Sequence, residues 1–134
     1  MEEEIFEVDF KGNFKCKAIF PGLYGCLALV HVSKDGAEAW HVSGMDLSMR
    51  LNQEHRRMWL MTDSGESSIE SCDGRFEDWF DIVDENPGVT YLCGPNADRV
   101  AREFFNVEEE NCFRTKEGPV DVMFDLKELK FNVL

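Results

Sequence analysis

The chain of 134 residues carries a formal net charge of −13, and 43% of its residues are apolar, among them eleven Phe and three Trp. This composition predicts one domain, residues 1–134, with a substantial hydrophobic core. The negative charge argues against nucleic acid as a partner, because phosphates would be repelled, and no apolar run approaches the roughly 18 residues of a membrane span.

The first third of the chain predicts β-strands. Residues 5–10 alternate between apolar and charged side chains, and residues 14–20 alternate again after a turn signal at Gly12-Asn13. Pro21-Gly22 breaks that run. Residues 26–32 are apolar in nearly every position, which predicts a central strand buried on both faces.

The motif Lys34-Asp35-Gly36 predicts a hairpin turn, after which residues 38–43 return as the next strand. On that strand His41 shares its face with small side chains, Ala39 and Ser43. Such a face leaves room for an accessible site.

This hairpin allows two registers. A two-residue turn ending at the glycine pairs His41 with Val30 and leaves Cys26 about 13 Å from the histidine at the rise of a strand. A four-residue loop over residues 33–36 pairs His41 with Ala28. Cys26 then shares the face of the histidine, about 7 Å away along a diagonal.

The remainder mixes helices and strands. We expect helices over residues 47–55, capped by Asp46, over residues 76–84, and from an Asn96 cap through Val107; strands over residues 57–62 and 89–93; a loop over residues 63–74; and a closing strand or hairpin over residues 120–134. The sum is an α+β domain, built on a mostly antiparallel sheet or sandwich with two to three helices packed on it.

One pair of residues has side chains suited to nucleophilic catalysis. Cys26 follows the glycine-containing turn Leu23-Tyr24-Gly25-Cys26, and His41 lies on the return strand of the hairpin. A histidine can take the proton of a neighbouring thiol, and the resulting thiolate is a nucleophile toward an amide carbonyl. Taken singly, a buried thiol and a hydrogen-bonded strand histidine are common core residues, and the chemistry depends on whether the two meet.

This arrangement resembles the catalytic core of the glutamine deamidases of the cytotoxic necrotizing factor class, which carry a Leu-Ser-Gly-Cys turn and a histidine on the next strand. The chemoreceptor glutamine deamidases and the amidases of N-terminal asparagine are similar in plan. The resemblance implies that Cys26 is the nucleophile and His41 the general base. It also implies that the backbone N–H groups of Gly25 and Cys26 bind the oxyanion.

The chain departs from these families at two positions. Tyr24 stands where the toxin motif has serine, and Phe20 stands where the chemotaxis enzymes have a threonine that completes the catalytic group. The group that orients His41 is therefore either a backbone carbonyl or a polar residue that the motif does not identify.

The other site signals are weak. The five cysteines, an odd number without paired spacing, predict reduced thiols in the cytoplasm, and the acidic start at residues 1–4 is unlike a signal peptide. No spacing of His and Cys predicts a metal, and no motif predicts a cofactor. His31 is expected to be a hydrogen-bonded core or edge histidine, and His55 a surface residue.

The sequence supports two classes of function. The first is a protein glutamine or asparagine side-chain amide hydrolase that works through a Cys–His thioester on a protein substrate. The second is an acidic, non-catalytic module that binds a basic protein partner, as an immunity protein or inhibitor does, and this includes an inactive form of the deamidase-like fold. Short acidic runs, such as residues 78–85, serve the second function or simply solvate the surface.

Overall fold

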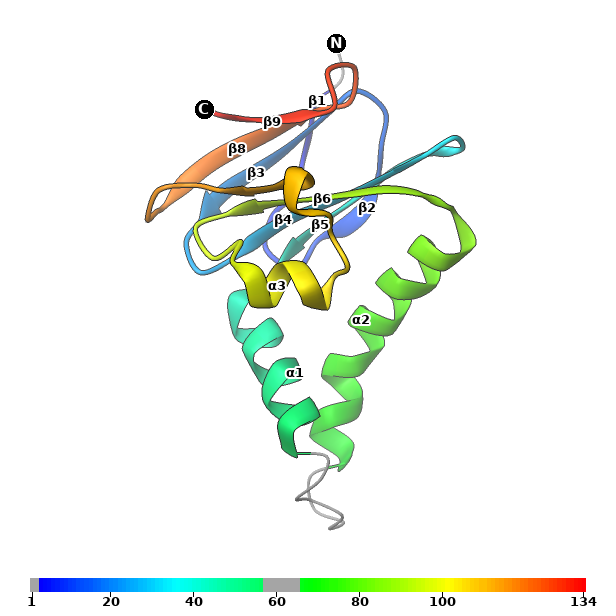
Figure 1. Ribbon diagram of the computed structural model, residues 1–134, viewed down its shortest axis with the longest axis vertical. Helices are drawn as coiled ribbons and strands as arrows, with labels where there is room; N and C mark the ends of the chain where they lie inside the picture. The colour runs from blue at the N-terminus through cyan, green and yellow to red at the C-terminus, as the bar shows by residue number, and fades with distance from the viewer. Residues whose placement is uncertain (1–2, 57–65) are drawn as a thin grey trace.

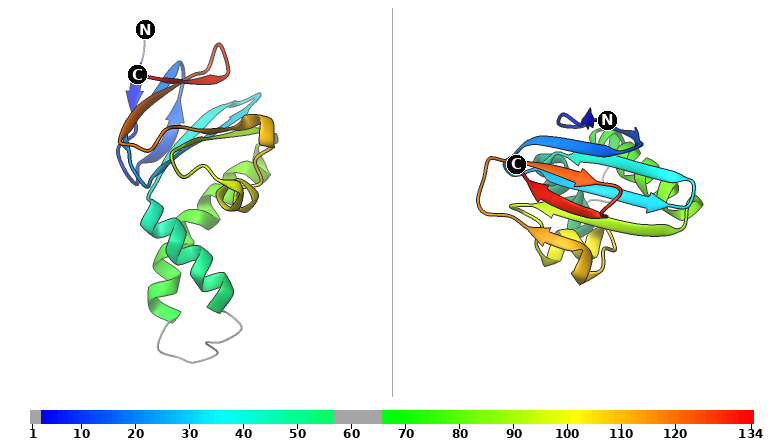
Figure 2. Two further views of the ribbon diagram at one scale, coloured as in Figure 1. Left: turned by 60° about the vertical axis from the view of Figure 1, so that its left-hand side comes forward. Right: turned by 90° about the horizontal axis from the view of Figure 1, so that it is seen from above.

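The computed structural model describes the backbone of residues 3–56 and 66–134, and the side chains of all of these except 52–56 and 66–73. Its described part contains nine strands in two sheets together with three α-helices, so the α+β class is confirmed. The two sheets lie face to face, and the helices cover the outer face of one of them (Figures 1 and 2).

The first sheet has the strand order β1-β3-β8-β9. Its β1 pairs in parallel with β3, whereas the β3–β8 and β8–β9 pairs are antiparallel. The closing hairpin expected over residues 120–134 is confirmed by β8 and β9. The strands of this sheet are β1 (Glu3–Ile5), β3 (Lys17–Leu23), β8 (Val120–Asp125) and β9 (Lys130–Val133).

The second sheet has the order β2-β5-β4-β6-β7, with β4 at its centre. Five consecutive residues of β4 are buried, which confirms the strand predicted to be covered on both faces. The strands of this sheet are β2 (Lys11–Phe14), β4 (Leu27–Ser33), β5 (Gly36–Val42), β6 (Gly88–Gly94) and β7 (Cys112–Arg114).

The helices lie on the side of the second sheet that faces away from the first sheet. The two long ones, α1 and α2, run away from the sheets as an antiparallel pair, and α3 lies under β6 (Figure 1). Their bounds are α1 (Gly44–Arg56), α2 (Glu66–Glu85) and α3 (Arg99–Phe104), and a short 3₁₀ turn, η1 (Glu109–Asn111), precedes β7.

Two hydrophobic cores share the second sheet. Alternate residues of β4 serve each core: Ala28 and Val30 face the first sheet, and Leu27 and Leu29 face the helices. The inner core, between the sheets, is rich in phenylalanine, and the outer core, under the helices, holds Trp40 with Phe and Leu side chains. The apolar composition of both faces of β4 follows from this double burial.

The β4–β5 hairpin adopts the second of the two expected registers. Ser33 pairs with Gly36 across a tight turn, and Ala28 pairs with His41. Gly36 has φ 144°, a conformation that side chains disfavour, so the glycine after Asp35 permits this turn. Cys26 and His41 therefore belong to the same face of the sheet.

Two of the strands predicted at the start of the chain are wrong. The strand expected over residues 5–10 ends at Ile5, because the chain leaves the first sheet at Phe6 and enters the second at Lys11. The run expected over residues 14–20 is split between β2 and β3, which lie in different sheets. Gly12-Asn13 is part of β2 and makes no turn. Alternation continues across both breaks, so it does not mark them.

Four further expectations were wrong. Asp46 does not cap α1, because this helix begins at Gly44 and Asp46 lies in its first turn. Pro21-Gly22 lies within β3, where the pairing with β8 shifts register. Residues 66–74 are helical and belong to α2, although their Ser and Gly content predicted a loop. Asp98, not Asn96, caps α3, since its carboxylate accepts a hydrogen bond from the N–H of Ala101 at 3.0 Å, and α3 ends at Phe104. The strand expected over residues 57–62 lies outside the described residues.

Candidate active site

Cys26 lies between a turn and the first residue of β4. The preceding Gly25 has φ 74°, a left-handed conformation that favours glycine. The cysteine is partly exposed, and its side chain packs against the inner core. A thiol in this position can be reached from solvent while it contacts the face that carries His41.

His41 lies near the end of β5 and is fully buried. Its ring packs edge-on against Phe20, with 6.2 Å between the ring centroids. The segment that joins β1 to β2 holds it at three points: Nδ1 lies 2.7 Å from the carbonyl oxygen of Phe6, the backbone N–H donates to Phe10, and the carbonyl accepts from Asp9. The imidazole is therefore fixed by the chain around Phe6.

The register places Cys26 and His41 as diagonal neighbours. His41 pairs with Ala28, and residues two apart on a strand share a face, so Cys26 lies one step along that face from the histidine. Diagonal neighbours are about 7–8 Å apart at their Cα atoms and come closer through their side chains. No hydrogen bond joins the thiol to the ring within the described part of the chain.

The protonation state of His41 follows from its two ring nitrogens. A carbonyl oxygen only accepts hydrogen bonds, so Nδ1 carries the proton that it donates to Phe6. Burial lowers the pKa of His41 from its ordinary value, against the raising effects of the Phe6 hydrogen bond and of Glu7 and Asp9. The ring is consequently neutral near pH 7, with a lone pair on Nε2, and Nε2 has no partner among the described residues.

Backbone atoms enclose the turn before Cys26. Three glycines from three other segments press against its carbonyl oxygens: a Cβ on Gly44 would collide with the oxygen of Gly25, one on Gly118 with that of Leu23, and one on Gly94 would lie 2.9 Å from that of Cys26. No hydrogen bond within the described residues uses the backbone N–H of Gly25 or Cys26. Neither donor is therefore occupied within the described part of the fold.

Two surface pockets meet at Gly25. One, of about 370 Å³, is lined by Tyr24, Asn96 and Glu117 together with Gly25, Pro95 and Gly118. The other, of about 150 Å³, lies between the start of α1 and α3, and Gly25 and Asn96 line it too. Tyr24, at 71% exposure, stands at the rim of the larger pocket. A ligand can approach Gly25 through this opening.

The carbonyl of Phe6 is the group that orients the His41 ring, which the sequence alone did not identify. Of the two alternatives, a backbone carbonyl or an unidentified polar residue, the structure provides the carbonyl. No sequence signal identifies such an acceptor, because every residue has one and only the fold decides which carbonyl reaches the imidazole.

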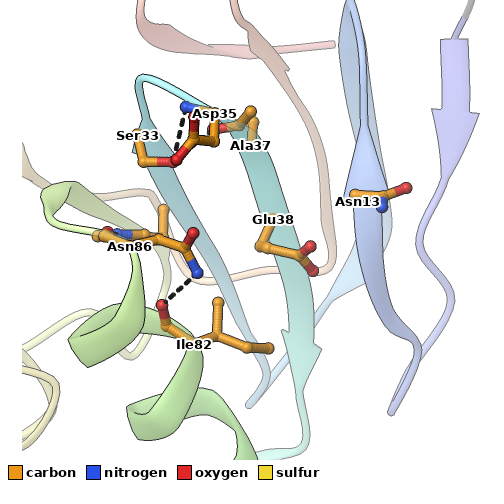
Figure 3. A pocket seen from close by; sticks show the side chains of 9 residues that line it. Asn13, Ser33, Asp35, Ala37, Glu38, Ile82 and Asn86 are labelled. Atoms are coloured by element: carbon orange, nitrogen blue, oxygen red, sulfur yellow. Dashed lines mark hydrogen bonds between the residues drawn. The ribbon is translucent and has the colours of Figure 1, made fainter.

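A third pocket, of about 100 Å³, surrounds the other buried histidine at the far end of β4 and is lined by Glu38, Asn86 and Ser33 (Figure 3). His31 lies 2.8 Å from the Thr90 hydroxyl through Nδ1 and contacts the Asn86 carbonyl through Nε2. The expectation of a hydrogen-bonded core histidine is confirmed, and neither ring nitrogen is left for chemistry. The side chain of His55 lies outside the described residues.

Among the described residues, no group of three or more His, Cys, Asp or Glu side chains could hold a metal ion. Likewise, no helix in the described part of the chain has the length and apolar character needed to cross a membrane. Comparisons with protein-family models and with curated proteins find no match to this chain.

Proposed function

We propose that the chain is a cysteine-dependent amide hydrolase that deamidates a glutamine or asparagine side chain of a protein substrate. Cys26 is the nucleophile, His41 is the general base and acid, and the N–H groups of Gly25 and Cys26 bind the oxyanion. The third group is the carbonyl of Phe6, which orients the imidazole and is a positioning group because it touches no reacting atom.

The observation that carries this proposal is the hydrogen bond from Nδ1 of His41 to the Phe6 carbonyl. It leaves the unpartnered Nε2 as an acceptor on the face that Cys26 shares. An orienting acceptor, a neutral imidazole and a nearby nucleophile are the arrangement by which a base activates a thiol. A histidine that served packing alone would gain nothing from a buried, unpaired nitrogen, which costs free energy.

The reaction follows from these atoms. Nε2 of His41 takes the proton of the Cys26 thiol, and the thiolate attacks the carboxamide carbon, so that the C=O electron pair moves to oxygen. The N–H groups of Gly25 and Cys26 stabilise that oxygen. The C–N bond then breaks as His41 returns its proton to nitrogen and ammonia leaves. Water, deprotonated by His41, cleaves the thioester and leaves a carboxylate.

The test is turnover of unfolded casein and of blocked Gln-Gly and Asn-Gly dipeptides, followed by ammonia release and by a mass gain of about one dalton as an amide becomes an acid. Cys26→Ser and His41→Ala should each abolish turnover, and the double variant should look like either single one, because the residues act as one unit. Circular dichroism checks that the variants fold. Turnover that survives in Cys26→Ser contradicts the proposal.

One observation favours the second candidate, a module that binds a basic protein. Asp78, Asp81 and Asp84 lie on the exposed side of α2 with Glu77 and Glu85 beside them, so α2 presents an acidic face. Two of these acids have basic partners, since Lys11 pairs with Asp78 and Arg50 with Glu77. Charge of this kind speeds association with a basic partner. If charge reversal at the three aspartates abolishes the biological effect of the protein while Cys26→Ser leaves it intact, this binding function is correct and the enzyme function is not.

A further inference from the structure

The segment between β6 and α3 is held rigidly. The carbonyl of Gly94 accepts hydrogen bonds from the N–H groups of Ala97, at 3.2 Å, and Thr115, at 3.1 Å. The carbonyl of Pro95 accepts from Nε of Arg114 at 3.1 Å. That of Asn96 accepts from the N–H of Asp98 at 2.8 Å. Four hydrogen bonds thus fix the backbone on both sides of Asn96.

This rigid segment is also in contact with the turn before Cys26. Gly94 approaches the Cys26 carbonyl so closely that no side chain fits between them. Two residues later, Nδ2 of Asn96 lies 3.8 Å from the position that a Cβ on Gly25 would occupy. The missing side chain of Gly25 therefore leaves the carboxamide of Asn96 next to the oxyanion donors.

The carboxamide of Asn96 has no structural role among the described residues. It is exposed, makes no hydrogen bond within the described residues, and does not cap α3, because Asp98 does. It lines both pockets that meet at Gly25. An unoccupied N–H₂ donor at the junction of the two pockets is placed to meet a ligand oxygen.

We infer that Asn96 is a further catalytic residue, whose Nδ2–H donates a hydrogen bond to the oxygen of the substrate carboxamide as that oxygen becomes negative. This inference rests on the proposed function. When the S–C bond forms and the C=O electron pair moves to oxygen, the oxyanion then has three donors, two from the backbone and one from Asn96. The bond to Asn96 weakens again when the C–N bond breaks and the carbonyl re-forms.

A neutral donor suits this role. An aspartate of the same shape would place a negative charge beside the oxyanion, and an alanine would remove the donor without adding charge. Loss of one oxyanion donor typically lowers kcat by about 10²–10³-fold. We therefore expect Asn96→Ala to reduce kcat by a factor of this order with KM little changed, and Asn96→Asp to reduce it further.

The experiment uses two probes of Cys26 in the full chain. The first is 6-diazo-5-oxo-norleucine, a glutamine analogue whose diazo carbon gains a proton before the thiolate displaces dinitrogen, and whose ketone occupies the place of the substrate carbonyl. The second is iodoacetamide, which reports the reactivity of the thiol. Labelling rates are followed by mass spectrometry for the wild type, Asn96→Ala, Asn96→Asp and Asn13→Ala, a matched control for an exposed asparagine on β2 away from the turn.

The expected result is diazoketone labelling at least tenfold slower in both Asn96 variants, with iodoacetamide labelling unchanged and Asn13→Ala like the wild type. Diazoketone labelling of Asn96→Ala at the wild-type rate overturns the inference and leaves the proposed function intact. Equal slowing with both probes overturns it too, because the thiol itself is then disturbed. A wild type that reacts with iodoacetamide but not with the diazoketone contradicts the proposed function, and the inference with it.

Discussion

Two opposing influences act on the pKa of the His41 imidazole. Burial disfavours its charged form, whereas the hydrogen bond to Phe6 and the nearby Glu7 and Asp9 favour it. Burial is the larger, so the pKa is lowered and the ring is neutral near pH 7. The neutral state suits the proposed role of a base, since a protonated imidazole has no lone pair that could accept a proton.

This pKa shift predicts a pH dependence of stability. The folded-state pKa of His41 lies below its ordinary value of 6.5, so the unfolded chain binds the proton more readily. Its contribution to the free energy of unfolding is fully present above about pH 6.5 and is lost as the pH falls toward the folded-state pKa. His41→Asn keeps a donor for Phe6 but does not titrate, so its stability should fall less between about pH 7 and pH 5.

Urea unfolding at several pH values measures this difference. The variant is expected to be less stable than the wild type at pH 7, because the packing of the imidazole against Phe20 is lost. Parallel stability curves for the two proteins would show that His41 does not titrate between the two states.

The cysteines should differ in reactivity. Cys26 is expected to react with iodoacetamide near pH 7 faster than Cys16, although Cys16 is exposed, because the proposed function assigns His41 as the base for the Cys26 thiol. Cys93 should be inert, since burial raises its pKa to about 12. Mass spectrometry of partly modified protein gives the three rates. In His41→Asn the advantage of Cys26 over Cys16 should disappear, and equal rates in the wild type argue against activation of Cys26.

At the scale of elements, close backbone approaches fix the position of the turn before Cys26. At Gly44, the first residue of α1, a Cβ would collide with the Gly25 carbonyl. Gly74 in α2 differs, since a Cβ there would meet no described atom within 4 Å and its φ is ordinary. The two positions make a matched pair.

We expect Gly44→Ala to lower the free energy of unfolding by about 1–3 kcal/mol, the usual cost of overpacking, and to impair turnover by displacing Gly25. Gly74→Ala should raise it by roughly 0.5–1 kcal/mol, because alanine is the better helix former. Denaturant titration and the ammonia assay measure both effects. A neutral Gly44→Ala would mean that α1 can move away from the turn at no cost.

Some local elements were predictable from the sequence, whereas contacts between distant segments were not. The β4–β5 hairpin is marked by its turn residues and by two apolar strands, and the amphipathic spacing of Phe76, Trp79 and Phe80 marks the second half of α2. The parallel pairing of β1 with β3 has no local signal. It brings Phe6 beside His41, so the third member of the site depended on a contact that alternation cannot reveal.

The same division applies to the candidate site. Cys26, His41 and Gly25 were identified from one short stretch of chain, because the hairpin brings them together. The sequence predicts Asn96 as a helix cap, because asparagine is a preferred residue at that position. Only the geometry of residues 94–98 assigns the cap to Asp98 and frees Asn96.

At the scale of the whole molecule, the second sheet is the central layer, because both hydrophobic cores pack against it.

The negative charge of the chain affects its stability. The net charge of −13 destabilises the compact state through repulsion, and α2 adds to this, since its last turn has acidic residues and no basic one beside the negative end of the helix dipole.

Added salt should therefore raise the free energy of unfolding by screening this repulsion. Glu85→Lys in the last turn of α2 should stabilise the protein by about 0.3–1 kcal/mol at low ionic strength, with a smaller gain at high salt. Unfolding at about 0.02 M and about 0.5 M sodium chloride measures both. Glu85→Gln serves as the control, because it removes one charge without adding another. A gain independent of salt would point to packing instead of charge.

The glycine contacts around Cys26 also bear on how such a site can diversify. The turn before Cys26 is enclosed by main-chain atoms of the segments around Gly44, Gly94 and Gly118. A side chain at any of these glycines would contact a carbonyl oxygen of the turn too closely, so these positions cannot vary. The rim is different: Tyr24 and Glu117 present exposed side chains to the larger pocket, and neither has a role in the proposed chemistry. Under the proposed function, substitutions at the rim alone would change which protein substrate binds, while the main-chain atoms around Cys26 stay in place. A mutant library designed to change the protein substrate should therefore vary the rim residues Tyr24 and Glu117.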